Sequence, residues 1–91
     1  MIRRIVEYVA ADRDLARAYL ADLAEGRYSE QDQSPEYAAA HERVCVAEDE
    51  LTPRQYNAAD RITELVNKRL WVQIWDFEDD LERREIWRGE L

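Results

Sequence analysis

Apolar residues recur at intervals of three or four along residues 2–25, and this spacing places them on one face of an α-helix. Asp12 and Arg13 interrupt the face midway. Either they pair across the edge of one helix, or a new helix begins with Asp12 as its N-cap. We favour one helix over residues 2–25, because the apolar phase is kept from Val9 to Ala16, and we expect Gly26 to close it with a positive φ. The face consists of Ile2, Ile5, Val6, Val9, Ala16, Tyr19, Leu20 and Leu23.

A polar stretch without periodicity covers residues 26–34, and we expect it to form an exposed loop. Ser34, Pro35 and Glu36 then supply an N-cap side chain, a proline at the first helical position and an acid in the first turn. Together they predict a second helix over residues 35–50. Its apolar face has few large side chains and consists of Tyr37, Ala40, Val44, Ala47 and Leu51.

Thr52 and Gln55 flank Pro53 in the arrangement of a capping box, which predicts the start of a third helix at residue 53. Neither glycine nor proline occurs again before Gly89, so one helix over residues 53–88 is predicted, about 54 Å long. A compact domain of this size is narrower than that. The alternative is a break near residues 67–70. The apolar face consists of Tyr56, Ala59, Ile62, Val66, Leu70, Ile74, Phe77 and Leu81.

Residues 70–77 are rich in aromatic and β-branched side chains, and they also fit an extended strand. We favour a helix, because a strand needs a partner strand and the only candidate, residues 44–46, is weak. Such a helix is apolar nearly all round and has to be covered on both sides. The first two helices cover one side, and we expect a second copy of the chain to cover the other through Trp71, Trp75 and Ile86. The alternative is a four-helix monomer whose core holds both tryptophans.

The predicted fold class is therefore all-α. We expect one domain over residues 1–91, because 91 residues are too few for two separate cores. This domain is a small bundle of three helices, or four if the last one breaks, with a long C-terminal helix, and it forms a homodimer.

Candidate catalytic or metal-binding residues are few. His41, Cys45 and Glu48 share one face of the second helix, and zinc accepts ligands of these types. A structural zinc site needs four ligands and the chain has no second histidine or cysteine, so we expect a half-buried His41 beside a small buried Cys45. The two glycines do not form a phosphate-binding loop, and no turn provides oxyanion donors near the thiol. We therefore expect no enzyme activity, no metal and no cofactor.

The net charge of −8 is concentrated in two parts of the sequence. Residues 26–52 carry −5 and residues 76–91 carry −4, whereas residues 53–75 carry +2. An acidic surface repels phosphates, so direct nucleic-acid binding is not expected. No apolar run approaches the length of a membrane span, and acids interrupt any signal-like start, so we expect a cytoplasmic protein, in the host cell if the gene belongs to a phage.

This charge distribution favours binding to a basic protein surface, steered by the long-range field of the acids. Inhibitors that occupy nucleic-acid grooves, among them phage-encoded anti-CRISPR and other anti-defence proteins, are frequently small, acidic and helical. By analogy with that class alone, we predict such an inhibitor. The alternative is a homo-oligomeric adaptor or assembly module whose acidity serves only solubility. The expected partner contacts are Glu48, Asp49, Glu50, Asp76, Glu78, Asp79, Asp80 and Glu82.

Overall fold

The computed structural model describes residues 2–84, with the side chain of Glu30 left out. Its helices are α1 (Ile2–Ala24), the 3₁₀ helix η1 (Glu30–Asp32), α2 (Pro35–Asp49), α3 (Pro53–Val66) and α4 (Lys68–Arg83). No strand occurs within this described range, and α4 spans residues 70–77. The all-α prediction is confirmed and the strand alternative is wrong. The predicted continuation over residues 85–88, with Ile86, lies outside the described residues.

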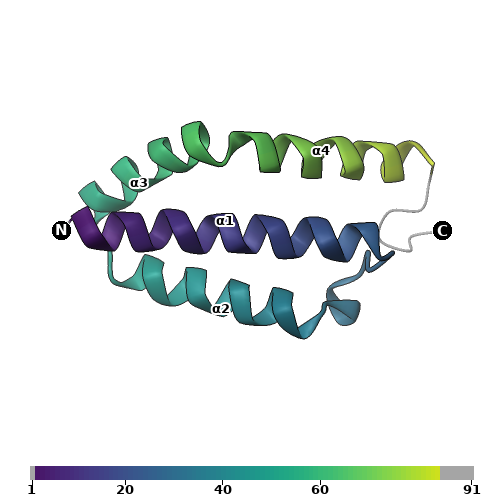
Figure 1. Cartoon of the computed structure of the whole chain (residues 1–91), viewed down its shortest axis with the longest axis horizontal. Coiled ribbons are helices and arrows are strands. Elements are labelled where there is room, and N and C mark those ends of the chain that lie inside the picture. The colour runs from purple at the N-terminus through teal and green to yellow at the C-terminus, as the bar shows by residue number, and fades with distance from the viewer. Residues whose placement is uncertain (1, 85–91) are drawn as a thin grey trace.

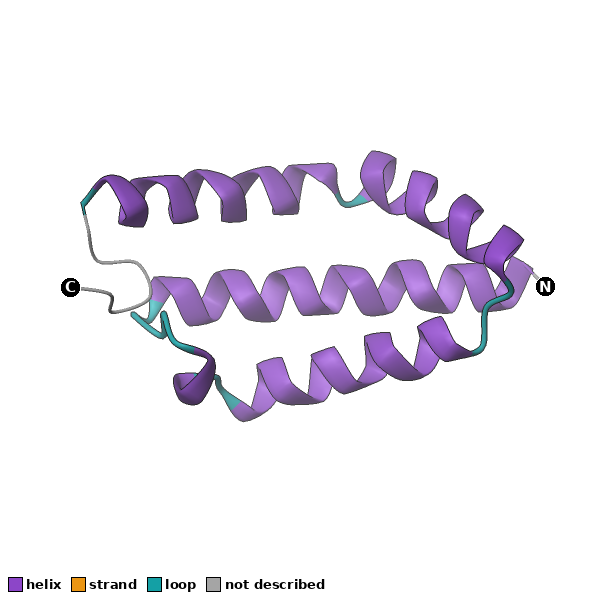
Figure 2. Ribbon diagram, turned by 180° about the vertical axis from the view of Figure 1, so that it is seen from behind, coloured by secondary structure: helices purple, strands orange, loops and turns teal. Residues whose placement is uncertain are grey.

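Helix α1 lies in the middle of the molecule, with α2 along one side and α3 and α4 in line along the other (Figure 1). The view from behind shows the same order (Figure 2). The two flanks meet almost entirely through α1, because α2 hardly touches α3 or α4. The molecule measures 45 × 24 × 18 Å and is therefore elongated. Its radius of gyration is 14.3 Å, against about 12 Å expected for a compact chain of this length.

The best-packed part of the core lies between α1 and α4. Its centre consists of Ala16, Leu23, Ile74 and Leu81, each at most 1% exposed. Half-buried side chains surround this centre, namely Tyr19, Leu20, Tyr28, Leu70, Trp71 and Phe77. In α2 only Ala40 is fully buried. The second helix therefore contributes less apolar burial than the others, as its pattern predicts.

Helix α1 runs without interruption and ends in a Schellman motif, so the single-helix prediction is confirmed. The N–H of Arg27 donates to the carbonyl of Asp22 at 2.9 Å, and the N–H of Gly26 donates to the carbonyl of Leu23 at 3.1 Å. Gly26 has a φ of 83°. This left-handed conformation suits glycine, which has no Cβ to clash with the backbone.

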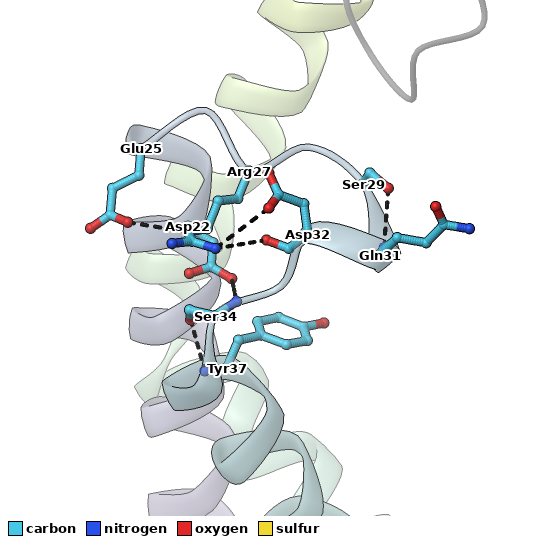
Figure 3. Close-up of polar contacts among 8 residues, drawn as sticks. All are labelled: Asp22, Glu25, Arg27, Ser29, Gln31, Asp32, Ser34 and Tyr37. Atoms are coloured by element: carbon cyan, nitrogen blue, oxygen red, sulfur yellow. Dashed lines mark hydrogen bonds and ion pairs between the residues drawn. The ribbon is translucent and has the colours of Figure 1, made fainter.

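The chain then passes into α2 through a turn held by two buried polar residues, Asp22 and Ser34 (Figure 3). The Asp22 carboxylate accepts from the backbone N–H of Ser34 at 3.0 Å, and Ser34 Oγ accepts from the N–H of Tyr37 at 3.1 Å. Arg27 closes the outside of the turn by donating to the carbonyl of Asp32 at 3.2 Å. The predicted N-cap of α2 is confirmed. We call this region the α1–α2 turn.

The start of α3 is also as predicted. Thr52 Oγ1 accepts from the N–H of Gln55 at 3.2 Å, and the N–H of Thr52 donates to Gln55 Oε1 at 2.9 Å. Both hydrogen bonds of the capping box are therefore present.

The prediction of one helix over residues 53–88 is wrong, because the chain breaks at Asn67, and the alternative of a break near residues 67–70 is confirmed. The alternative in which the core holds both tryptophans is wrong for Trp75, which is 53% exposed. The Asn67 side chain is buried against α1, where its Nδ2 donates to the carbonyl of Val9 at 3.1 Å and to Asp12 Oδ2 at 2.9 Å. Its Oδ1 accepts from Arg13 Nε at 3.2 Å, and Asp12 also accepts from the indole N–H of Trp71 at 3.0 Å. The polar interruption in α1 thus faces the residue at which the opposite helix breaks. We call these contacts the Asn67 joint.

Candidate protein-binding surface

The predicted acidic contacts fall at opposite ends of the molecule. Glu48, Asp49 and Glu50 lie at the end of α2, beside the start of α1, whereas residues 76–82 lie in the last half of α4, at the far end of the long axis (Figure 1). The molecule is 45 Å long. The two acidic groups therefore do not form one surface.

Within α4, three of the five candidate carboxylates are exposed and two are engaged. Asp76, Asp79 and Glu82 are exposed and form no ion pair with any other residue in the described range. The carboxylate of Asp80 lies 3.3 Å from Nη1 of Arg84. Glu78 is half-buried and accepts a hydrogen bond from the hydroxyl of Tyr19. The carboxylates available to a partner on this helix are those of Asp76, Asp79 and Glu82.

Tyr19 connects α4 to the aromatic side chains of α2. Burial, together with the hydrogen bond to Glu78, raises the pKa of the Tyr19 phenol well above its usual value, because both favour the neutral form. Its ring meets that of Tyr37 edge to face at 5.5 Å, and Tyr37 stacks on His41 at 6.3 Å. Glu78 therefore has a structural role in this arrangement.

At the α2 end, all three candidate carboxylates are exposed. The carbonyl of Glu50 accepts from Nη1 of Arg4 at 3.1 Å, which fixes the end of α2 against α1. The carboxylates of this α2 group, like the exposed ones of α4, form no ion pair among residues 2–84. Arg4 lies beside the α2 acids, however, and its charge offsets part of theirs. The acidic part of α4 is thus the better candidate for a basic partner.

Exposed apolar side chains gather where α3 meets α4. Leu65 is 81% exposed, Val66 54% and Trp75 53%, and Ile62 and Val72 are also exposed. The expectation that Tyr56, Ile62 and Val66 lie on the buried face of the third helix is wrong, because all three are exposed. Thr63 and Asn67 take the inner positions instead, because Asn67 is drawn onto α1 by its hydrogen bonds to Val9 and Asp12.

The two tryptophans of α4 have different environments. Trp71 packs against the core, and its indole N–H donates to Asp12 at 3.0 Å. Trp75 extends into solvent and lines, with Trp71, an open hollow of about 510 Å³ between α1, α3 and α4. The rest of the hollow is lined by Asp12, Asp60, Thr63, Glu64, Leu65 and Lys68.

Two exposed residues beside Trp75, Leu65 and Lys68, were not among the predicted contacts. Both line the hollow with Trp75, and both line a second hollow with Val72. The spacing of Leu65, Lys68, Val72 and Trp75 is three, four and three residues, as on one side of a helix. That spacing is a signal in the sequence, although the charge of Lys68 interrupts the apolar pattern there.

The expectation of a half-buried His41 beside a buried Cys45 is wrong. Both are exposed, and Cys45 Sγ lies 3.9 Å from Nδ1 of His41 on the solvent side of α2. Within residues 2–84, no group of three metal-ligating side chains comes together.

None of the described helices is long and apolar enough to cross a membrane. Comparisons with protein-family models, with curated proteins and with solved structures found no match.

Proposed function

We propose that this protein is a non-enzymatic protein-binding module that inhibits a partner by engaging its basic, nucleic-acid-binding surface. The observation that carries the proposal is the acidic face of α4, where Asp76, Asp79 and Glu82 are exposed and have no ion-pair partner among the described residues. They occur every three residues, which spaces them by about 4.5 Å along the helix axis. An arginine-rich surface that binds phosphates also binds such a row of carboxylates.

The charge of the whole chain supports the same proposal. A net charge of −8 creates a long-range field that attracts a basic protein and repels nucleic acid. Exposed carboxylates keep most of their hydration until a partner arrives, so their ion pairs with it depend strongly on salt. Inhibition then follows from occupancy, because the partner's basic groups are no longer free to bind phosphates.

A binding experiment with a basic probe tests the role of α4. Nona-arginine carrying a fluorophore is titrated with the wild type and with two triple variants, D76N/D79N/E82Q and E48Q/D49N/E50Q, in about 50 mM NaCl. The two variants have the same net charge, and they lose it at opposite ends of the molecule. We expect the α4 variant to bind roughly tenfold more weakly than the wild type and the α2 variant to change by less than about threefold.

Equal weakening by both triple variants would mean that only net charge matters, and unchanged binding by the α4 variant would exclude the acidic face of α4 as the site. Repeating the titration in about 200 mM NaCl should weaken wild-type binding markedly, because the contacts are between exposed charges.

A second candidate function is self-assembly, and the exposed apolar side chains at the junction of α3 and α4 favour it. Leu65, Val72 and Trp75 are costly to leave in water, and a copy of the same chain is the commonest partner for such a surface. In this case the acidity of the chain serves solubility.

A further inference from the structure

We propose that two copies of the chain associate through their α4 helices, packed antiparallel around a twofold axis between Val72 and Trp75. The surface involved is a row of six exposed side chains, which we call the α4 ridge. It consists of Leu65, Lys68, Val72, Trp75, Asp79 and Glu82. The inference rests on the second candidate function, self-assembly, and specifies how the two copies pack against each other.

The first argument is the spacing of the ridge. Its members are separated by three, four, three, four and three residues, which is the heptad spacing of a helix that packs along another helix. All six side chains face solvent. Leu65 belongs to the last turn of α3, but it lines one hollow with Lys68 and Val72 and another with Lys68 and Trp75. The ridge therefore continues across the break at Asn67.

The second argument is the order of side chains along the ridge. Leu65 is followed by the cation Lys68, then by the apolar Val72 and Trp75, and last by the anions Asp79 and Glu82. In an antiparallel pair centred between residues 72 and 75, each Val72 lies against the other copy's Trp75. The same register sets Lys68 against Asp79 of the other copy, twice. Beside the ridge, Arg69 then lies near Asp76 of the other copy.

The order of charges also selects the orientation. A parallel pair in register sets Lys68 against Lys68 and Asp79 against Asp79, and facing like charges oppose association. The antiparallel pair replaces these two repulsions with attractions, and it sets Glu82 against Leu65 of the other copy in place of Glu82 against Glu82. From Lys68 to Asp79 the ridge is therefore complementary to a copy of itself in the antiparallel orientation, and self-complementarity is the requirement for a twofold interface.

The residues at the centre suit an interface. Trp75 is 53% exposed and Val72 36% exposed, so both have apolar surface left to bury. Tryptophan is the residue type most enriched among energetically important interface positions. Each copy carries a charge of −8 and the copies repel at long range, so we expect reversible association at micromolar concentrations.

Dimerisation and the binding of a basic partner involve overlapping residues but are separable. Asp79 and Glu82 serve both, so a basic partner has to displace the second copy. Lys68 serves only the pairing of copies. A change at Lys68 therefore tests the dimer without removing any carboxylate from the acidic face of α4.

Chemical cross-linking tests the register directly, because Lys68 is the only lysine in the chain. A carbodiimide joins a lysine amine to a carboxylate in direct contact, so apart from the N-terminal amine every cross-link starts at Lys68. A mixture of ¹⁴N- and ¹⁵N-labelled chains at about 50 µM should give a covalent dimer in which Lys68 is joined to Asp79 of the other copy. The absence of a dimer, or joining of Lys68 to Glu48–Glu50 instead, would overturn the proposal.

Charge exchange gives the second test. Sedimentation equilibrium should show that K68E and D79K each weaken wild-type dimerisation by about tenfold or more, and that the double variant K68E/D79K restores it to within about threefold. R43E, on the exposed side of α2, has the same net charge as K68E and should leave dimerisation nearly unchanged. Circular dichroism checks that each variant folds.

A wild type that sediments as a monomer at these concentrations, or a double variant without rescue, would exclude the antiparallel pair. The nona-arginine titration tests the proposed function separately. K68E keeps every carboxylate of the acidic face of α4, so it should bind nona-arginine at least as tightly as the wild type. If K68E lost dimerisation but kept nona-arginine binding, the two inferences would both stand. If dimerisation were unchanged in K68E, only the antiparallel pair would fall.

Discussion

The chain is shaped by two buried polar sites, the α1–α2 turn and the Asn67 joint, and they differ in the range of their contacts. In the turn, Asp22 accepts from Ser34, twelve residues further along the chain. In the joint, Asn67 and Trp71 meet Asp12 and Arg13, and the contacts span 54 to 59 residues. One site closes a local change of direction, and the other attaches one flank of the molecule to its central helix.

This difference determines when each site can form. The caps of the turn need only residues 22–37 to come together, so they stabilise the turn wherever these residues are helical. The joint needs α1 and α3–α4 to be docked first, because its donors and acceptors come from both. We therefore expect the joint to depend on tertiary packing and the turn to be largely independent of it.

The largest effect is expected from N67A. The substitution removes all three hydrogen bonds of a side chain that is 1% exposed, and it leaves a small cavity. We expect the free energy of unfolding to fall by about 3 kcal/mol, measured by urea denaturation. N57A, at an exposed position of α3, is the control and should change stability little. A loss below about 0.5 kcal/mol for N67A would mean that the joint does not hold the flank.

In the α1–α2 turn, D22A should have the next largest effect. Asp22 is 3% exposed, and removal of its carboxylate leaves the N–H of Ser34 without its acceptor. We expect a loss of about 2 kcal/mol, because an unsatisfied buried donor retains its full desolvation cost. D22N keeps an acceptor oxygen and should recover part of the loss. D14A, at an exposed position of α1, should be nearly neutral, and an equal loss in D14A would contradict the role of the turn.

The N-cap of α2 provides a test of independence. S34A removes the acceptor of the Tyr37 N–H and should cost about 1 kcal/mol. Because the cap belongs to the turn alone, we expect the loss in S34A/N67A to equal the sum of the single losses within about 0.5 kcal/mol. Marked non-additivity in urea denaturation would show that the two sites are coupled and that the distinction between them fails.

The same distinction explains which features could be predicted from the sequence. Gly26, Ser34 and the capping box of Thr52 act within six residues, and the helix ends they predict are present. Asn67 resembles any polar residue on a helix when only its neighbours are considered. Its partners lie on α1, where the interruption at Asp12 and Arg13 was visible but gave no indication of what it faced.

The candidate site shows the same limit. Exposure of Asp76, Asp79 and Glu82 follows from their phase relative to the buried Ile74 and Leu81. By contrast, Glu78 sits beside a tyrosine 59 residues away, and no local pattern predicts that contact. The rotation of α3 about its own axis also differs from the prediction. Two neighbouring faces of this helix share Ala59, and the burial of Asn67 selects the face that contains Thr63.

A smaller effect, again of long range, is expected from the ionisation of Tyr19. Burial and the hydrogen bond to Glu78 raise the pKa of this phenol above 10, its value in the unfolded chain, so the folded state favours the neutral form. The resulting stabilisation is complete below pH 10 and is lost as the pH rises above 10 toward the folded-state pKa. Because Tyr19 is partly exposed, we expect the free energy of unfolding to fall by only about 0.5 kcal/mol between pH 9 and pH 11.

The variant Y19F tests this expectation. It cannot ionise and keeps the ring contact with Tyr37, so its urea midpoint should fall less than that of the wild type over this range. If both fell equally, the contact with Glu78 would contribute nothing to the attachment of α4, and the Asn67 joint would be left as the main long-range polar contact holding that flank.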